Sequence, residues 1–271
     1  MKKLIRNIVI VVLFSFSAAW LAKIDNYWAQ VGFIILSSIV GLAIGSLSDF
    51  IDKHNQSIAT WVKAKVIYNN KELFLSFSYL YRIEIGGKYL LIRGKRLKKQ
   101  YQPVGGVYQF YEQGRSYLES INALPGGDFV GSEESADLRL RIKGKYLLGF
   151  YDWFSQMKDR EYDPTREFYE ELIIQGYLDE KDFKHLRYRK VGVHNKGITK
   201  SLVPGRMPEV MYADIFEIIL TDDQKEKISE AVRRHPNELY LADINEVLHR
   251  MTKDSVDMNI SNSASWVLGG G

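Results

Sequence analysis

Two long apolar stretches, separated by a short polar turn, begin the chain and constrain its fold most strongly. Residues 4–22 are apolar apart from two polar residues near their start, and residues 27–47 are apolar with Gln30 as the main polar interruption. Each stretch approaches the roughly 20 residues that a helix needs to cross a bilayer. We therefore expect a two-helix transmembrane hairpin over residues 1–47.

The charges that flank the two stretches predict their orientation. Lys2, Lys3 and Arg6 lie at the start of the first stretch, whereas the turn at residues 23–26 carries only one lysine and one aspartate. By the positive-inside rule, the N-terminus and everything after the second stretch lie in the cytoplasm. A cleaved signal peptide is the alternative interpretation of the first stretch. The second stretch favours an uncleaved hairpin that crosses the membrane twice.

The second stretch carries small residues at a repeated spacing. Ser37, Gly41 and Gly45 are each four residues apart, a pattern that lets membrane helices approach closely. The resulting seam serves either the packing of the two helices within one chain or the association of several chains. Both interpretations stay open on the sequence.

The rest of the chain has the pattern of a mixed α and β domain. Residues 48–65 are polar and indicate a juxtamembrane connector, and residues 66–258 indicate one domain of the α+β class. We expect residues 259–271, which end in three glycines, to form a loosely ordered tail. The expected strands are residues 73–85, 88–93, 138–142 and 210–220, with a hairpin at Gly86-Gly87, and the expected helices are residues 163–176, 221–234 and 239–251.

Composition limits the chemistry of this domain. The chain has no cysteine, so disulfides and thiolate metal sites are excluded. A formal net charge of +4 suits an anionic ligand or a membrane surface, but is too small to indicate a DNA or RNA polymer as a partner. The 17 tyrosines and 13 phenylalanines favour a β-rich domain with aromatic stacking surfaces.

Three carboxylates crowd one face of the helix expected at residues 163–176. Glu167, Glu170 and Glu171 lie three and four residues apart, directly after Arg166. This spacing brings like charges together, which is unfavourable unless a cation lies among them, and Mg²⁺ prefers carboxylate oxygens. The helix therefore offers a magnesium site, with a solvated glutamate-rich face as the plainer alternative.

A basic run at residues 93–99 precedes a glycine turn. Arginine and lysine supply positive charge, and backbone amides at glycines approach an anion closely. The segment therefore indicates a phosphate-facing surface, although most charge runs are simply solvated. The residues that we expect to contact phosphate or stack on a base are Arg96, Lys98, Tyr101, Gln102, Gly105 and Gly106.

The glycine turn and the acidic helix together resemble the Nudix box. Gly106 and Glu112 match its opening, and its helical half is matched by Arg166, Glu167, Phe168, Glu170 and Glu171. Two features depart from the family pattern: residues 115–165 separate the halves, and Ile173 replaces a late glycine. The resemblance implies a divergent Nudix-like α/β/α sandwich with a mixed sheet. In a hydrolase of this family, Mg²⁺ would work with Glu112, Glu167, Glu170 and Glu171.

Over nearly its full length, the chain resembles the SMODS-associated Nudix effectors, bacterial proteins that join two membrane spans to a divergent Nudix-like domain. These proteins act in cyclic-oligonucleotide-based antiphage signalling (CBASS). The resemblance implies that the domain binds a cyclic di- or oligonucleotide made by a partner nucleotidyltransferase (CD-NTase). The spans would then self-associate among the membrane lipids and disrupt the inner membrane, which causes abortive infection. The segments that carry the resemblance are residues 100–106, 159–161, 166–172 and 213–217.

Three functions are compatible with these observations. The first is a ligand-binding effector that is not an enzyme and requires no cofactor, in which Arg166 joins the ligand-binding residues. The second is a membrane-anchored, Mg²⁺-dependent Nudix hydrolase acting on a nucleoside diphosphate derivative, with the metal on Glu167, Glu170 and Glu171. The third is a membrane-tethered interaction protein that keeps only the fold.

Overall fold

The computed structural model describes residues 58–94, 99–126, 136–201, 205–253 and 258–268, together with residues 31, 34, 35 and 38. The chain divides into two compact units, Met1–Lys63 and Ala64–Gly271. The expected spans lie almost entirely outside the described residues, as do Ser37, Gly41 and Gly45. Among the residues that the structure does describe, no helix is long and apolar enough to cross a membrane.

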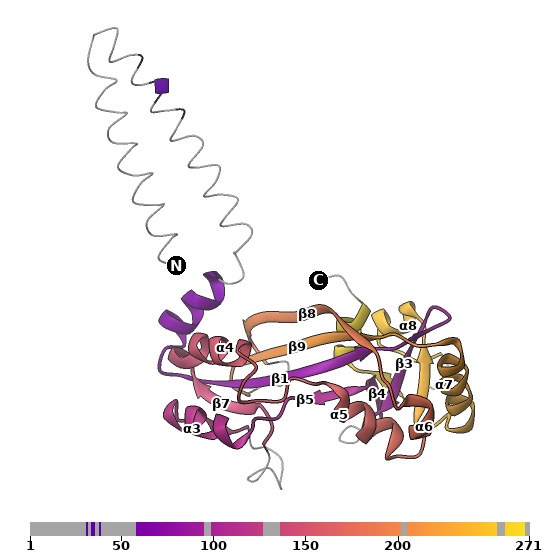
Figure 1. Ribbon diagram of the computed structural model, residues 1–271. Helices are drawn as coiled ribbons and strands as arrows, with labels where there is room; N and C mark the ends of the chain where they lie inside the picture. Colours follow the sequence, from indigo (N-terminus) through magenta and orange to yellow (C-terminus); the bar gives the residue numbers. More distant parts are fainter. Residues whose placement is uncertain are drawn as a thin grey trace. The chain divides into compact units, whose positions relative to one another are not determined.

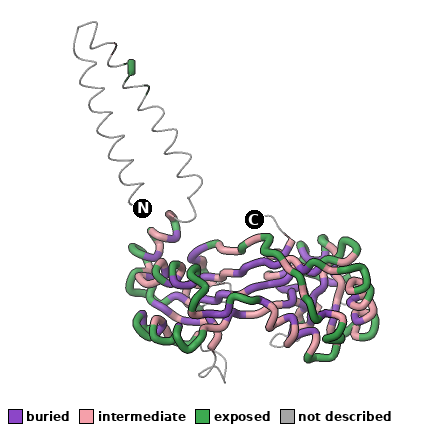
Figure 2. Tube along the Cα trace, viewed as in Figure 1, coloured by how far each residue is buried: buried purple, intermediate pink, exposed green. Residues whose placement is uncertain are grey.

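A six-stranded mixed sheet forms the larger half of the domain (Figure 1). The long central strand β1 runs parallel to β9 on one side and antiparallel to β7 and β5 on the other. Strand β8 closes one edge of the sheet and carries mostly intermediate and exposed residues (Figure 2). The six strands are β1 (Glu72–Arg82), β5 (Gly105–Val107), β6 (Leu124–Pro125), β7 (Arg139–Lys143), β8 (Tyr188–Thr199) and β9 (Glu209–Ile218).

A second, five-stranded sheet follows the order β10-β3-β4-β11, with β2 paired to β3. Gly86 and Gly87, with φ of +57° and +77°, form the expected two-residue turn between β2 and β3, which confirms the predicted hairpin. The prediction of a domain of α and β elements with a mixed sheet is therefore confirmed, although the strands divide into two sheets. The strands of the second sheet are β2 (Glu84–Ile85), β3 (Lys88–Arg93), β4 (Gln100–Pro103), β10 (Leu239–Ala242) and β11 (Asn259–Ile260).

Short helices cover the ends of the domain. Figure 1 places α3 and α4 at the β7 end of the larger sheet, and α7 and α8 beside β3. Thr221 caps α7 as predicted, because its side chain accepts from the N–H of Gln224 in a capping box. The helices are η1 (Lys63–Ile67), α3 (Glu112–Ser120), η2 (Gly144–Tyr146), α4 (Leu147–Ser155), α5 (Thr165–Phe168), η3 (Tyr169–Ile173), α6 (Glu180–Phe183), α7 (Asp222–Arg234), α8 (Ile244–His249) and η4 (Asn262–Leu268).

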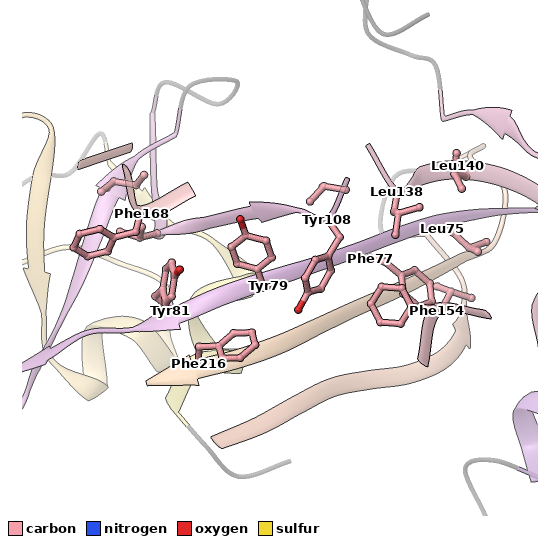
Figure 3. Close-up of a cluster of buried hydrophobic side chains, with 14 of the residues drawn as sticks. Leu75, Phe77, Tyr79, Tyr81, Tyr108, Leu138, Leu140, Phe154, Phe168 and Phe216 are labelled. Atoms are coloured by element: carbon pink, nitrogen blue, oxygen red, sulfur yellow. The ribbon is translucent and has the colours of Figure 1, made fainter. Parts of the chain in front are cut away.

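The main core is built on one face of β1. Successive side chains of a strand point to opposite faces, so alternate residues of β1 enter the same core. Phe77 lies beside Phe154 (Figure 3), with ring centroids 4.8 Å apart. Its ring centroid is also 4.9 Å from that of Phe150 and 4.8 Å from that of Tyr212. The β1 residues on this face, all at most 1% exposed, are Leu73, Leu75, Phe77, Tyr79 and Tyr81.

The helix expected at residues 239–251 was only half correct. Leu239–Ala242 forms β10, which pairs with β3, and the helix α8 begins only after Asp243. The Asp243 side chain accepts from the N–H groups of Asn245 and Glu246, so it caps the helix at that point. Strand β3, which is far away in the sequence, supplies the backbone hydrogen bonds of Leu239–Ala242. Apolar periodicity alone does not reveal such pairing.

The tail expected to be loose is instead part of the domain as far as residue 268. Ile260 pairs with Tyr101 where β11 joins β4, and η4 follows. Ile260, Ala264 and Val267 are at most 1% exposed, so their apolar side chains hold the segment against the sheets. Residues 269–271 lie outside the described residues.

Candidate functional site

The two halves of the divided Nudix box meet in the folded domain. Strand β5 pairs with β1, where Gly105 lies opposite Leu80 and Gly106 opposite Tyr79. The α5–η3 segment contacts β5: the Gly105 N–H donates to Glu171 Oε2 over 3.0 Å. Arg166 Nη2 donates to the carbonyl oxygen of Val107 over 2.9 Å. The long insertion between the halves therefore leaves their contact intact.

Close contacts surround both Gly105 and Gly106. Gly105 has φ of +141°, and a Cβ there would lie 2.3 Å from the carbonyl oxygen of Tyr79. A Cβ on Gly106 would lie 2.0 Å from Glu167 Oε1. In this structure the groups that approach these glycines are therefore the domain's own backbone and carboxylate.

Arg166 lies among the carboxylates of the acidic helix. Its Nε donates to Glu161 Oε1 over 3.0 Å, and its Nη1 donates to Glu167 Oε1 over 2.7 Å. The same Nη1 lies 3.3 Å from both carboxylate oxygens of Glu170. One guanidinium thus offsets the repulsion among three glutamates. The sequence interpretation did not include Glu161 in this site, because it precedes the helix and has no place in the helical spacing.

The electrostatics of this cluster follow from its burial. Burial raises the pKa of Glu167, and the neighbouring Arg166 opposes that rise, while Glu170 adds to it. Burial alone would lower the pKa of Arg166, but the hydrogen bond to Glu161 and the surrounding negative groups raise it overall, so the guanidinium stays charged. Burial also raises the pKa of Tyr79, whose hydroxyl lies 3.4 Å from Glu161 Oε1.

The glutamates as arranged do not fit a magnesium site. Among the described residues, no group of three or more acidic or histidine side chains is placed to hold a metal ion. Glu167 and Glu170 face Arg166, and Glu171 accepts from the Gly105 amide, so their oxygens do not converge on one point. Glu112 begins α3, where its side chain is 78% exposed and pairs with Arg115.

The helix that carries the glutamates is irregular. It begins at Thr165, whose N–H donates to Asp163 Oδ1 over 3.0 Å, and it changes to a π-helix at Tyr169–Ile173. Single π turns are rare in proteins, but those that occur often lie at functional sites. The sequence contains no proline or glycine within the helix that would indicate this change.

The expected phosphate-facing residues are separated in the fold. Arg96 and Lys98 lie outside the described residues. Tyr101 was expected to stack on a base, but it is 5% exposed, its ring stacks on Tyr240 at 5.1 Å, and its hydroxyl donates to Pro236 O. Tyr101 is therefore a core residue in this structure. Gln102, its neighbour, points to the opposite face of β4 because side chains alternate along a strand.

Gln102 lines a groove of about 880 Å³ on the outer face of the larger sheet, which we call the β8 groove. Strands β8 and β9 form its floor, and α8 and η4 lie along its side. It has one acidic residue, Glu209, and its basic residues are Arg82, Lys196, Lys200 and Arg250. The sequence interpretation missed this groove because it treated residues 259–271 as a loose tail.

A mixed-sheet α/β domain in which a glycine turn meets an Arg-Glu helix is consistent with a Nudix-like fold. The family model described as "SMODS-associated NUDIX domain" matches residues 72–268, and the chain therefore belongs to that family. Membership suggests an effector of the CBASS type. Neither the curated proteins nor the solved structures contain a significant match.

Proposed function

We propose that this chain is a membrane effector of cyclic-oligonucleotide-based antiphage signalling. Its Nudix-like domain binds a cyclic di- or oligonucleotide made by a partner nucleotidyltransferase. Its N-terminal spans then oligomerise in the inner membrane and disrupt it, so that the infected cell dies. The family match over residues 72–268 supports the assignment to this signalling system.

One observation supports binding without turnover: Arg166 lies where a Nudix hydrolase would need converging carboxylates for a metal. The guanidinium engages Glu161, Glu167 and Glu170, and Glu171 is engaged by the Gly105 amide. A hydrolase would have to give up these contacts before its glutamates converged on Mg²⁺. A domain that keeps these contacts has the Nudix-like fold and uses it to bind a nucleotide rather than to hydrolyse one.

The proposed coupling between binding and the membrane follows from differential affinity. A ligand shifts an equilibrium only when it binds one state more tightly than the other. A nucleotide that prefers a clustered state of the chain would bring several copies of the second span together. Gly41 and Gly45 allow the close approach that such clustering needs.

A combined binding and turnover assay tests the proposal. The full chain, purified in a mild detergent, is titrated with cyclic di-AMP, cyclic di-GMP, cyclic GMP-AMP and cyclic tri-AMP by calorimetry, with and without Mg²⁺. The same mixtures, and a panel of nucleoside diphosphate derivatives, are then analysed by chromatography. We expect saturable binding of at least one cyclic nucleotide and no product. Product release that requires Mg²⁺ would instead support the membrane-anchored hydrolase.

A second experiment tests the membrane part. We expect Gly41→Leu/Gly45→Leu to abolish killing when the chain is expressed together with its nucleotidyltransferase, because the added side chains separate the helices. Ala43→Leu enlarges one side chain of the same span outside this spacing and serves as the control. Killing that survives the double substitution would exclude the glycine seam.

A further inference from the structure

We propose that the β8 groove is the site at which this domain binds its anionic nucleotide, with phosphates on Lys196 and Lys200 and the nucleobases beside Trp266. This inference rests on the proposed function and says where in the domain the nucleotide binds. The groove lies apart from the Nudix-box contacts, since none of Gly105, Gly106 and Arg166 lines it.

The floor of the groove is the outer face of the larger sheet. In the register of β8 with β9, His194 lies opposite Ala213 and Gly192 opposite Ile215. Ala213 and Ile215 belong to a small apolar cluster with Val267 of η4, on the face opposite the main core. The C-terminal segment therefore covers part of this face, and the uncovered part beside β8 forms the groove.

Two aromatic rings form one wall. Trp266 of η4 stacks on His194 of β8, with ring centroids 3.8 Å apart and an interplanar angle of 6°. Burial, and secondarily the charge of Lys196, lower the pKa of His194 to about 4, so the ring is neutral near pH 7. A neutral, partly exposed aromatic wall suits stacking with a nucleobase, which proteins use widely in binding nucleotides.

The cations of the groove have few acidic partners. Lys196 and Lys200 are exposed, and neither forms an ion pair with another described residue. Arg82 pairs with Glu217 through Nη2, but its buried Nε has no hydrogen-bond partner among the described residues. By contrast, Arg166 in the Nudix box contacts three carboxylates. Of these two regions, the groove is therefore the one whose positive charge is available to a phosphate.

An irregularity in β8 positions Lys196. The register with β9 shifts between Asn195 and Ile198, and Gly197 adopts a φ of +65°. Asn195 Oδ1 accepts from the Gly197 N–H over 3.0 Å, which holds the bulge. Bulges redirect side chains next to binding sites, and this one places Lys196 at the groove.

The remaining lining supplies hydrogen-bonding groups in a suitable volume. Gln100 and Gln102 of β4 and Ser263 and Ser265 of η4 line the groove. Amide and hydroxyl groups donate and accept, as the edges of nucleobases require. The volume of about 880 Å³ lies within the range of roughly 300–1,000 Å³ typical of small-molecule sites.

The test is a set of titrations with the cyclic nucleotides named above, using the full chain in detergent. We expect Lys196→Ala/Lys200→Ala to weaken binding about tenfold or more, because charge-assisted hydrogen bonds to phosphate are lost. Lys158→Ala/Lys184→Ala removes the same charge from exposed lysines outside the groove and should leave binding unchanged. Circular dichroism and thermal unfolding check that each variant is folded.

A second variant tests the aromatic wall independently of charge. Trp266→Phe keeps a ring against His194 but reduces the stacking surface, and we expect it to weaken nucleotide binding several-fold while leaving the affinity for inorganic pyrophosphate unchanged. If the wild-type chain binds a cyclic nucleotide and all groove variants bind it equally well, the groove assignment is wrong and the proposed function stands. If the wild-type chain binds none of the nucleotides, both are wrong.

Discussion

The Nudix-box contacts and the β8 groove lie in the same domain, but their charged side chains differ in pairing and in exposure. At the box, Glu161, Glu167 and Glu170 surround Arg166, and the side chains of this cluster are partly buried. At the groove, Lys196 and Lys200 are exposed and form no ion pair with a described residue. Paired, partly buried charges hold a structure together, whereas exposed unpaired cations remain available to a ligand. We therefore expect substitutions at the box to affect stability and those at the groove to affect binding.

The largest effect is expected at the glycine turn. Gly105→Ala would place a Cβ 2.3 Å from the backbone oxygen of Tyr79, at a φ that alanine does not tolerate. Because the clash is with a central strand, we expect a loss of about 4 kcal/mol in the free energy of unfolding. The measurement is a urea titration of the full chain in detergent, followed by tryptophan fluorescence. Gly176→Ala, at a φ of +76° with nothing within 4 Å, is the control and should cost only about 1 kcal/mol. Equal losses in the two variants would show that the contact with β1 is unimportant.

A slightly smaller loss is expected when the central cation is removed. Arg166→Met leaves Glu161 and Glu167 without their counter-charge, and breaking such a pair costs about 3 kcal/mol of stability. Burial raises the pKa of Glu167, so the loss should shrink as the pH falls and this carboxylate takes up a proton. Arg115→Met breaks the exposed pair with Glu112 and should cost less than about 1 kcal/mol. A pH-independent loss would indicate packing rather than charge as the contribution of Arg166.

A smaller effect is expected in the groove, from the histidine of the aromatic wall. The pKa of His194 is lowered to about 4 in the folded chain, because burial and then Lys196 disfavour its charge. The unfolded chain takes up a proton near pH 6.5 while the folded chain does not, so the stability contributed by the neutral ring is present above pH 6.5 and falls as the pH drops toward 4.

His194→Phe retains the stack on Trp266 but does not titrate. Between pH 6.5 and 4, we expect this variant to lose about 1 kcal/mol less stability than the wild-type chain, after allowance for solvent screening of a half-exposed ring. The check is the difference between unfolding curves at the two ends of this range. His185→Phe alters an exposed histidine outside the groove and is the control. Parallel pH profiles for wild type and His194→Phe would contradict the lowered pKa.

The smallest effect on stability is expected from the groove lysines. Lys196→Ala/Lys200→Ala removes exposed side chains without ion pairs, so the free energy of unfolding should change by less than about 0.5 kcal/mol. Thermal unfolding without ligand provides the measurement. If the free energy of unfolding fell by as much as it does in Arg166→Met, the two regions would not differ as proposed. The lysines would then contribute to stability.

Local chemistry made parts of the fold predictable. Gly86-Gly87 indicated a hairpin because only glycine readily adopts the left-handed φ that a two-residue turn requires. Thr221 indicated a helix start because its side chain satisfies an N–H in the first turn. Both signals depend on interactions within a few residues, and the structure confirms both.

Interactions between distant segments were not predictable in this way. Tyr101 was expected to stack on a ligand, but it is covered by Tyr240 and by the C-terminal segment that pairs with its own strand. Leu239–Ala242 was expected to be helical, but pairing with β3 makes it a strand. In both cases the deciding partner is far away in the sequence, so neither periodicity nor composition indicates it.

The sequence by itself determined the apolar N-terminal stretches, the two segments that resemble the Nudix box, and the turns and caps set by single residues. These depend on composition and on contacts within a few residues of the chain. Only the tertiary structure decided that Arg166 would neutralise the glutamates and that β8, α8 and η4 would enclose a basic groove. The reason is physical: a charge becomes a structural contact or a binding group according to what lies opposite it, and the fold alone determines its neighbours.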